Sequence, residues 1–181
     1  VVMIIALLLH AFGVYGLLLK LLAGLSPMRF FANMRPAAYM AFSTASSNAT
    51  IPVSLETAEK HQGVDNTVAS FTIPLGATVN MDGTSIMQGL ATIFIANAAG
   101  VDLTLTQLMT VILMATLSSI GTAGVPGAGM ITLAMVLKQV GLPEEGILLL
   151  LPVDRILDMC RTAVNITGDL AATCIVAKHE G

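Results

Sequence analysis

Six polar residues recur at helical spacing in the last apolar stretch of the chain. They are Asp154, Asp158, Arg161, Thr162, Asn165 and Asp169. At ~100° per residue, all six fall within about 100° of one another around a helix. Ionisable side chains in an apolar helix are costly, so they face a polar cavity or each other and often mark a substrate or ion pathway. The stripe therefore predicts a binding cavity, and a purely structural ion pair between Asp158 and Arg161 is the alternative.

The chemistry of this stripe suits a small zwitterion that carries an additional carboxylate. Arg161 can bind a carboxylate through two parallel hydrogen bonds. Asp158 can pair with an ammonium group, and Asn165 can donate to a second carboxylate. Asp169 lies one turn further on and is left without such a role. A carboxylate in that position suits a hard cation such as Na⁺.

The sequence Asn-Met-Asp-Gly-Thr at 80–84 interrupts another apolar stretch. Gly76 and Gly83 permit the helix to unwind. Unwound backbone exposes carbonyl oxygens, which bind hard cations alongside a carboxylate such as Asp82. A glycine-kinked helix with a capped break is the alternative, and it explains Gly83 but not the acid at position 82.

Two further segments, 43–52 and 118–129, are rich in small residues. Small residues let the backbone approach a ligand closely, and the start of a helix offers free N–H groups to an anion. The carbonyls of 119–122 can hold a cation, and the glycines of the second segment permit a hinge. These segments predict a binding site with a gate, and close helix packing through small residues is the alternative.

The composition identifies the class of protein. Of the 181 residues, 55% are hydrophobic and 10% are charged, whereas an average soluble domain has ~25% charged residues. So few charges cannot cover a water-facing surface, and eight scattered basic residues form no nucleic-acid footprint. We therefore expect an all-α integral membrane protein in contact with the lipid bilayer, with no nucleic-acid partner. On one helix, Cys160 and Cys174 lie ~21 Å apart, so both are expected to be free thiols.

The apolar pattern also predicts the elements that position these residues. The stretches 37–42 and 108–117 are far shorter than the ~20 residues that span a bilayer, which predicts re-entrant hairpins. A loop through Arg35 and Pro36 precedes the first hairpin. Paired short segments interrupted by Gly and Pro are typical of the binding site of a secondary transporter. The expected elements are a transmembrane helix at 1–25, re-entrant hairpin 1 at 37–60, an interrupted transmembrane helix at 68–99, re-entrant hairpin 2 at 107–140 and an amphipathic transmembrane helix at 146–177.

Three motifs in order resemble one family. They are the sequence at 80–84, Gly-Thr-Ala-Gly-Val-Pro-Gly at 121–127, and the polar stripe of 154–169. Together they resemble the dicarboxylate/amino acid:cation symporter family, which includes glutamate and aspartate transporters. The resemblance covers essentially the whole chain and implies a glutamate-transporter-like transport domain, truncated to its C-terminal part. It implies that N-terminal scaffold helices are missing here, along with a span that completes one sodium site.

The resemblance also implies a set of site residues. Arg161 is expected to hold the side-chain carboxylate of the substrate, Asp158 its amino group, and Asn165 its α-carboxylate. The implied substrate-binding residues are Ser46, Ser47, Thr84, Val125, Gly129, Asp158, Arg161, Thr162 and Asn165. The implied sodium-binding (metal) residues are Gly76, Asn80, Asn165 and Asp169 in one site, Thr78, Ser119, Ile120 and Thr122 in a second, and Asn80 and Asp82 in a third.

Some positions depart from the pattern of the family. Asn48 stands where many relatives have a third consecutive serine, and Ala45 stands where some archaeal members have an arginine that Arg155 can replace. Gln88 stands where mammalian proton-coupled relatives carry Glu, which favours sodium coupling without that proton step. The presence of both Asp158 and Arg161 favours aspartate or glutamate over plain dicarboxylates and neutral amino acids.

The expected function is secondary active symport of L-aspartate or L-glutamate with sodium ions, with hairpin 2 as the gate. The protein is expected to be a multi-pass protein of the cell (inner or plasma) membrane, a homotrimer in its full-length form, and not an enzyme. Sodium acts as the coupling ion and no cofactor is expected. The alternatives are a proton-coupled dicarboxylate or glutamate symporter, a non-transporting membrane fragment, and an intramembrane aspartyl protease using Asp82 and Asp169. The protease leaves Arg161 and both hairpins unexplained.

Overall fold

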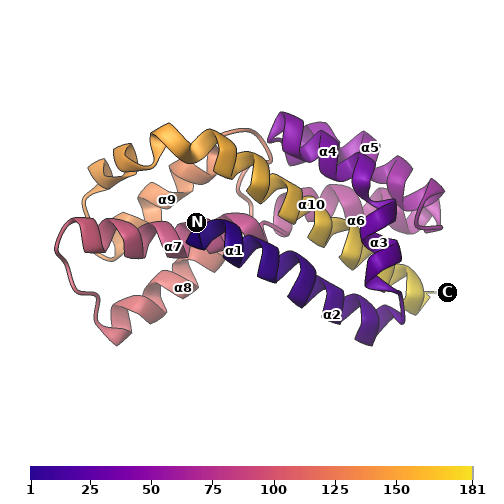
Figure 1. Cartoon of the computed structure of the whole chain (residues 1–181), viewed down its shortest axis with the longest axis horizontal. Coiled ribbons are helices and arrows are strands. Elements are labelled where there is room, and N and C mark those ends of the chain that lie inside the picture. Colours follow the sequence, from indigo (N-terminus) through magenta and orange to yellow (C-terminus); the bar gives the residue numbers. More distant parts are fainter. Residues whose placement is uncertain (181) are drawn as a thin grey trace.

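The computed structural model describes residues 1–180, which form helices joined by short connections, with no strand among them (Figure 1).

The first helix is long and apolar. The first helix runs through α1 (Val2–Leu8), the π-helical η1 (Leu9–Tyr15), α2 (Gly16–Leu18) and the π-helical η2 (Leu19–Ala23). Its 22 residues have a mean hydropathy of 2.4, and it alone in the described chain is both long and apolar enough to cross a membrane.

A helical hairpin follows the first helix. Its arms are α4 (Arg35–Thr44) and α5 (Ser47–Lys60), which pack against each other. The chain reverses at Ala45, which has a φ of 52°, and the Oγ atom of Ser46 then caps α5 by accepting from the Ala49 N–H at 3.2 Å. The loop expected through Arg35 and Pro36 is helical instead: the short helix α3 (Pro27–Asn33) precedes the hairpin, and both residues lie in the first turn of α4. Proline is preorganised for a first helical turn, and Phe30 is buried.

The interrupted helix consists of α6 (Asn66–Val79) and α7 (Asp82–Ala98). Asp65 caps α6 by accepting from the backbone N–H of Thr67 at 2.8 Å. The helix breaks at Asn80 and Met81, where both residues leave helical backbone angles. The break therefore lies inside the segment that the sequence indicates.

A second hairpin consists of α8 (Leu105–Ser119) and α9 (Ala128–Gln139), joined by residues 120–127. A capping box between Thr104 and Gln107 starts α8. The last helix was expected from 146, but α10 begins at Leu151 and runs to Glu180, after a 3₁₀ helix η3 (Glu144–Leu149). Pro152 lies in the first turn of α10, where its missing N–H costs no hydrogen bond within the helix.

The last helix, α10, is the axis of the fold. It runs along the whole molecule (Figure 1) and packs against α4, α5, α6, α7 and the first helix. Its C-terminal half contributes Ile166 and Leu170 to an apolar cluster with the first helix, α4, α5 and α6. A second cluster joins α7, α8 and α9 around residues such as Met87 and Leu133. The polar part of α10 therefore lies where these two clusters meet.

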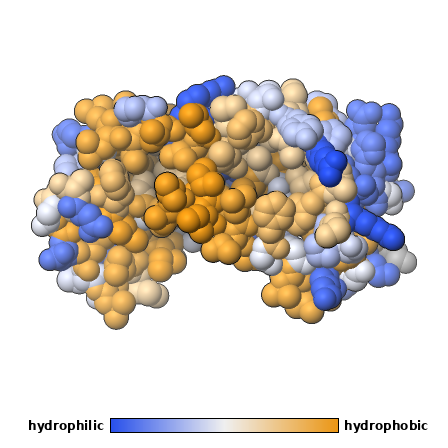
Figure 2. Space-filling view, viewed as in Figure 1, coloured by the Kyte–Doolittle hydropathy of each residue, from blue (hydrophilic) through white to orange (hydrophobic). Residues whose placement is uncertain are grey.

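The surface is unusually apolar. Figure 2 shows hydrophobic side chains over most of the middle of one face, with hydrophilic ones gathered towards the right-hand end. Large exposed hydrophobic residues include Leu9, Leu21 and Phe71. Exposed apolar patches of this extent are typical of surfaces that contact lipid or another protein. Both cysteines, Cys160 and Cys174, are free, as expected.

Candidate functional site

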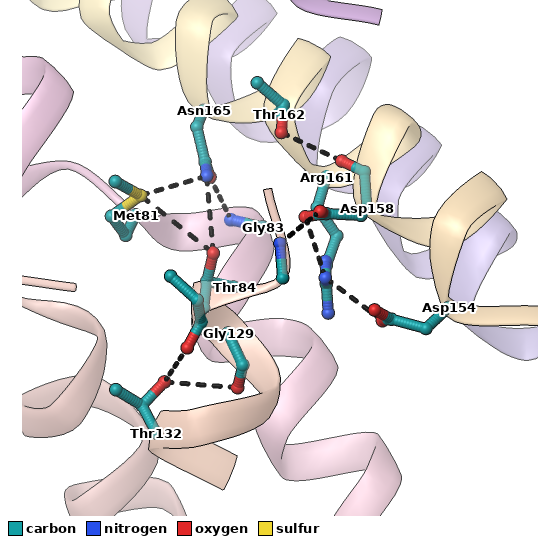
Figure 3. Close-up of polar contacts among 12 residues, drawn as sticks. Met81, Gly83, Thr84, Gly129, Thr132, Asp154, Asp158, Arg161, Thr162 and Asn165 are labelled. Atoms are coloured by element: carbon teal, nitrogen blue, oxygen red, sulfur yellow. Dashed lines mark hydrogen bonds and ion pairs between the residues drawn. The ribbon is translucent and has the colours of Figure 1, made fainter. Parts of the chain in front are cut away.

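Arg161 lies at the centre of the site and is only 1% exposed. Its Nη2 donates to Oδ1 of Asp158 at 2.8 Å and to Oδ1 of Asp154 at 3.2 Å (Figure 3). Its Nε and Nη1 are buried and have no hydrogen-bond partner among residues 1–180. Unmade hydrogen bonds of a buried cation cost free energy. These two donors are therefore available to an anionic ligand.

Asp158 connects α10 to the second hairpin. Its Oδ2 accepts from the backbone N–H of Gly127 at 2.9 Å, just before α9 begins. The Thr162 hydroxyl donates to the backbone carbonyl of Asp158 at 2.9 Å. The guanidinium on one side and the N–H on the other compensate the negative charge of this buried carboxylate. A ligand ammonium would have to compete with these two partners.

Asn165 connects α10 to the break between α6 and α7. Its Oδ1 accepts from the Gly83 N–H at 2.7 Å, and its Nδ2 lies 3.4 Å from Oγ1 of Thr84 (Figure 3). A Cβ atom at position 83 would lie 2.8 Å from the Arg161 carbonyl oxygen. Gly83 is thus needed because the start of α7 approaches α10 too closely for a side chain.

The tips of the two hairpins touch over this site. The carbonyl of Gly124 accepts from Oγ of Ser46 at 2.7 Å and from the backbone N–H of Asn48 at 3.0 Å. Beneath the contact lies a cavity of about 10 Å³, which is about the room of one water molecule. An amino acid is much larger, so at least one tip must move before such a ligand enters. The cavity is lined by Ala45, Ser47, Met81, Thr84, Thr122, Ala123, Gly124, Val125, Gly129, Asp158, Thr162 and Asn165.

The structure thus brings together all nine residues that were predicted to bind substrate. Seven of them line the cavity. The other two are Ser46, which bonds to the opposite tip, and Arg161, which bonds to Asp158. A Cβ atom at Gly129 would lie 3.5 Å from Nη1 of Arg161. The unpaired side of the guanidinium therefore faces the second hairpin.

The residues predicted for the first sodium site also lie together. Nδ2 of Asn80 donates to Oδ1 of Asp169 at 2.9 Å and to the Asn165 carbonyl at 3.1 Å. A Cβ atom at Gly76 would lie 2.6 Å from Oδ1 of Asp169. Asp169 is 1% exposed, and its Oδ2 has no hydrogen-bond partner in the described part of the chain. A buried carboxylate with one uncompensated oxygen, next to backbone carbonyls, suits a hard cation.

The residues predicted for the second sodium site meet at the end of α8. The Gly121 N–H donates to the Thr78 carbonyl at 2.9 Å, which places residues 119–122 against the end of α6. The Thr122 N–H donates to the Ser119 carbonyl at 3.1 Å. The φ of Gly121 is 81°, in the left-handed region, so a glycine suits this turn.

Asp82 of the third predicted sodium site has two partners on the first helix that were not predicted. The Tyr15 hydroxyl donates to its Oδ2 at 2.7 Å, and Nε2 of His10 lies 3.0 Å from the same oxygen. With Asn80 and Ser119, Asp82 and His10 border a groove of about 440 Å³. A signal was present, because His10 is one of the few polar residues in an apolar helix and Asp82 needs a partner.

The aspartyl protease alternative finds no support in this geometry. Such a mechanism needs two carboxylates that share a proton. Oδ2 of Asp82 is bonded to the first helix and Oδ1 of Asp169 to Asn80. No hydrogen bond joins the two carboxylates within residues 1–180.

Comparison with known proteins identifies the family. A model of the sodium:dicarboxylate symporter family matches residues 1–179. The chain belongs to this family. Its members are symporters, which are membrane transport proteins and not enzymes. The match confirms the resemblance that the motifs indicate and the expectation of a membrane protein.

Several individual relatives of this chain are excitatory amino acid transporters by name. A putative sodium-dependent excitatory amino acid transporter, glt-4 of Caenorhabditis elegans, is 44% identical over 178 residues, which cover 98% of this chain and 36% of the relative. Excitatory amino acid transporter 3 of Mus musculus is 43% identical over 170 residues, 94% of this chain and 32% of the relative. Excitatory amino acid transporter 1 of Homo sapiens is 42% identical over 183 residues, which cover 99% of this chain and 34% of the relative. The chain spans about a third of the length of these relatives.

Proposed function

We propose that this chain forms the substrate- and ion-binding part of a sodium-coupled symporter for L-aspartate or L-glutamate. The observation that carries the proposal is the buried Arg161, which is paired with Asp158 and whose Nε and Nη1 have no partner in residues 1–180, with Nη1 facing the second hairpin. The names of the relatives support the same class of substrate, because they are excitatory amino acid transporters and one is described as sodium-dependent.

The proposed substrate site assigns one charge of the ligand to each part of the cavity. The side-chain carboxylate binds the free donors of Arg161, near Thr84 and Gly129. The ammonium group binds Asp158 and Thr162, and the α-carboxylate binds Asn165 and the first tip at Ser46 and Ser47. The assignment is supported by the burial of both charged residues, since a ligand of opposite charges compensates them in a water-poor site. Val125 closes over the ligand from the second tip.

The proposed ion sites surround the break in the interrupted helix. Asp169 provides the charge for one sodium ion, with carbonyls of Gly76, Asn80 and Asn165. Carbonyls of Ser119, Ile120 and Thr122 with Thr78 provide a second site, and Asp82 with Asn80 a third. The unpaired Oδ2 of Asp169 supports the first assignment. No cofactor beyond these coupling ions enters the proposal.

The second hairpin, α8–α9, is the proposed gate. Its tip bonds to the first tip through one carbonyl, that of Gly124, to α10 through the Gly127 N–H, and to the end of α6 through the Gly121 N–H. Few bonds therefore need to break for it to open. Glycines at positions 121 and 127 with positive φ flank the tip and provide positions where the backbone can swing.

The proposal includes an arrangement in the membrane. We expect the hairpins α4–α5 and α8–α9 to re-enter from opposite sides of the bilayer, because each arm is too short to span it. The full-length protein is then a multi-pass protein of the cell membrane. A homotrimer built through scaffold helices outside this chain completes the expected assembly.

The test is uptake of labelled L-aspartate into liposomes that contain the product of the complete reading frame encoding this chain. Accumulation that requires an inward sodium gradient is the expected result. Accumulation driven by an inward proton gradient alone would replace sodium with proton coupling. Preferred uptake of succinate, which lacks the ammonium group, would replace the substrate. If aspartate is taken up with neither a sodium nor a proton gradient, and succinate is not taken up either, symport is overturned as the function of this protein.

A further inference from the structure

Gln88 of α7 is fully buried and bonds to both arms of the second hairpin. Its Oε1 accepts from the Ser118 hydroxyl at 2.8 Å, in the last turn of α8. Its Nε2 donates to Oγ1 of Thr132 at 2.6 Å, in α9. The side chain has an exposed fraction of 0%. One amide therefore holds together two helices whose nearest ends are separated by the whole tip, residues 120–127.

The arm of Thr132 leads to the proposed substrate site. The hydroxyl of Thr132 accepts from Gln88 and donates to the Gly129 carbonyl at 3.1 Å (Figure 3). A Cβ atom at Gly129 would lie 3.3 Å from Cγ2 of Thr84 and 3.5 Å from Nη1 of Arg161. A shift of Gln88 is thus transmitted through one hydroxyl to the backbone that faces the guanidinium.

The arm of Ser118 leads to the proposed second sodium site. The Ser118 carbonyl accepts from the Thr122 hydroxyl at 2.7 Å, and the neighbouring Ser119 carbonyl accepts from the Thr122 N–H at 3.1 Å. Ser119 and Thr122 are two of the residues whose carbonyls are proposed to hold sodium, and the Ser118 carbonyl is bonded to one of them. Gln88 is therefore linked to Thr122, at the ion-binding end of the tip, through Ser118 alone. It is linked to Gly129, at the substrate-facing end, through Thr132 alone.

The amide group fits these two partners chemically. Oε1 of Gln88 can only accept, so Ser118 donates to it, and Nε2 can only donate, so the Thr132 oxygen accepts from it while the Thr132 O–H donates to the Gly129 carbonyl. A primary amide supplies an acceptor and a donor in one side chain. The bonds to Gln88 are the shortest that either hydroxyl makes, at 2.8 Å for Ser118 and 2.6 Å for Thr132. In an apolar interior their loss is costly, so we expect the three side chains to move together.

We infer that Gln88 is a positioning residue that joins the two arms of hairpin α8–α9, so that sodium at residues 119–122 and substrate at Arg161 favour the same closed hairpin. The inference rests on the proposed function, because it couples the two sites assigned there. It adds a residue that contacts neither ligand. Coupling of this kind is a free energy shared by two sites, so it must act in both directions.

The first experiment measures how sodium changes the affinity for L-aspartate. Gln88→Met removes both hydrogen bonds and keeps a side chain of similar length. We expect the sodium concentration for half-maximal uptake to rise by about threefold to tenfold, as loss of one or two net hydrogen bonds predicts. The dependence of the aspartate KM on sodium should weaken in parallel. Ser118→Ala and Thr132→Val should each give part of the effect and add little to Gln88→Met.

The matched control is Thr92→Val. Thr92 lies one turn further along α7, is also fully buried, and its hydroxyl bonds to the backbone carbonyl of Gln88 at 2.7 Å, within the same helix. It should leave the sodium titration unchanged. An unchanged titration in Gln88→Met, or an equal shift in Thr92→Val, would overturn the inference.

A second measurement separates this inference from the proposed function. Hydrogen exchange of the backbone N–H groups in 120–130 requires no transported substrate. Gln88→Met should accelerate this exchange in the full-length protein, while Thr92→Val should not. If the unmodified protein fails to take up aspartate but exchange is accelerated, the proposed function fails and the role of Gln88 in positioning the hairpin stands. If exchange is unchanged, the role of Gln88 is refuted whatever the protein transports.

Discussion

Nε2 of His10 lies 3.0 Å from Oδ2 of Asp82, although 72 residues separate them in the sequence. The Tyr15 hydroxyl donates to the same oxygen at 2.7 Å, and the rings of His10 and Tyr15 meet edge to face at 4.7 Å between centroids. Two residues of the first helix thus fix one carboxylate oxygen. The Asp82 side chain keeps 41% of its surface exposed, so its second oxygen is available to a cation from the adjoining groove.

Tyr15→Phe tests whether this fixation matters for sodium. The variant keeps the ring and removes one hydrogen bond to Asp82. We expect the sodium concentration for half-maximal uptake to rise by about twofold to tenfold, the range for one net hydrogen bond, with aspartate KM at saturating sodium unchanged. Tyr39→Phe is the control, because Tyr39 is 69% exposed. Identical sodium titrations for the two variants would show that the bond from Tyr15 to Asp82 does not contribute to sodium binding.

Gly76→Ala tests the close approach at the first proposed sodium site. A methyl group there would lie 2.6 Å from Oδ1 and 2.9 Å from Cγ of Asp169, so the carboxylate must move. We expect sodium-dependent uptake to fall at least tenfold, since a cation site needs its ligands within a few tenths of an ångström. Gly89→Ala is the matched control, because a Cβ atom at position 89 would have no atom of a neighbouring residue within 4 Å. Equal uptake by the two variants would contradict a sodium site at Asp169.

The polar stripe of α10 could be predicted because it belongs to one helix. Asp158, Arg161 and Asn165 follow the helical period, so their common face follows from spacing alone. The break at Asn80 was also visible, because glycines and an acid interrupt an apolar run. Local sequence thus contained the parts of the site that a single element presents.

The contacts between elements could not be predicted in the same way. His10 and Tyr15 are five residues apart, which places them on different sides of an α-helix, but they lie in a π-helical segment with wider turns. The bond between Ser46 and Gly124 spans 78 residues and depends on how the hairpins pack. No periodicity encodes such a pairing.

Asp169→Asn tests the charge of the first proposed sodium site. Asparagine keeps the shape of the side chain and can still accept from Nδ2 of Asn80, but it removes the negative charge. We expect a steep rise in the sodium concentration needed for uptake, because the carboxylate is the one formal charge among these ligands. Asp102→Asn is the control, since Asp102 is exposed. An unchanged sodium titration would remove Asp169 from the ion site.

Ser46→Ala tests the contact between the tips. The variant removes the bond to the Gly124 carbonyl and also the cap of α5, which lowers the free energy of unfolding by about 1 kcal/mol. Ser26→Ala is not equivalent, because Ser26 makes no cap bond, so Asp65→Ala serves as the cap control. We expect Ser46→Ala to weaken aspartate binding beyond any effect of Asp65→Ala. Equal aspartate KM values in both variants would show that the tip contact does not hold the site closed.

Arg161→Ala tests the group on which the proposed substrate depends. The variant removes the donors for the side-chain carboxylate and leaves Asp158 and Asp154 without their guanidinium. Charged hydrogen bonds contribute about 1.5–3 kcal/mol each, so we expect aspartate uptake to fall by at least tenfold and in practice to be lost. Breaking a buried pair also destabilises the fold by about 3–5 kcal/mol. Loss of uptake therefore has to be separated from loss of folding.

Arg161→Lys and the control Lys178→Ala make that separation. Lysine keeps the charge between Asp154 and Asp158 but cannot form two parallel hydrogen bonds with a carboxylate, so the protein should fold while aspartate KM rises. Lys178 is exposed on the same helix, and its loss should leave uptake unchanged. Melting temperatures measured alongside uptake distinguish the two causes. Aspartate uptake at the level of the unmodified protein in Arg161→Lys would mean that the guanidinium fork does not recognise the substrate.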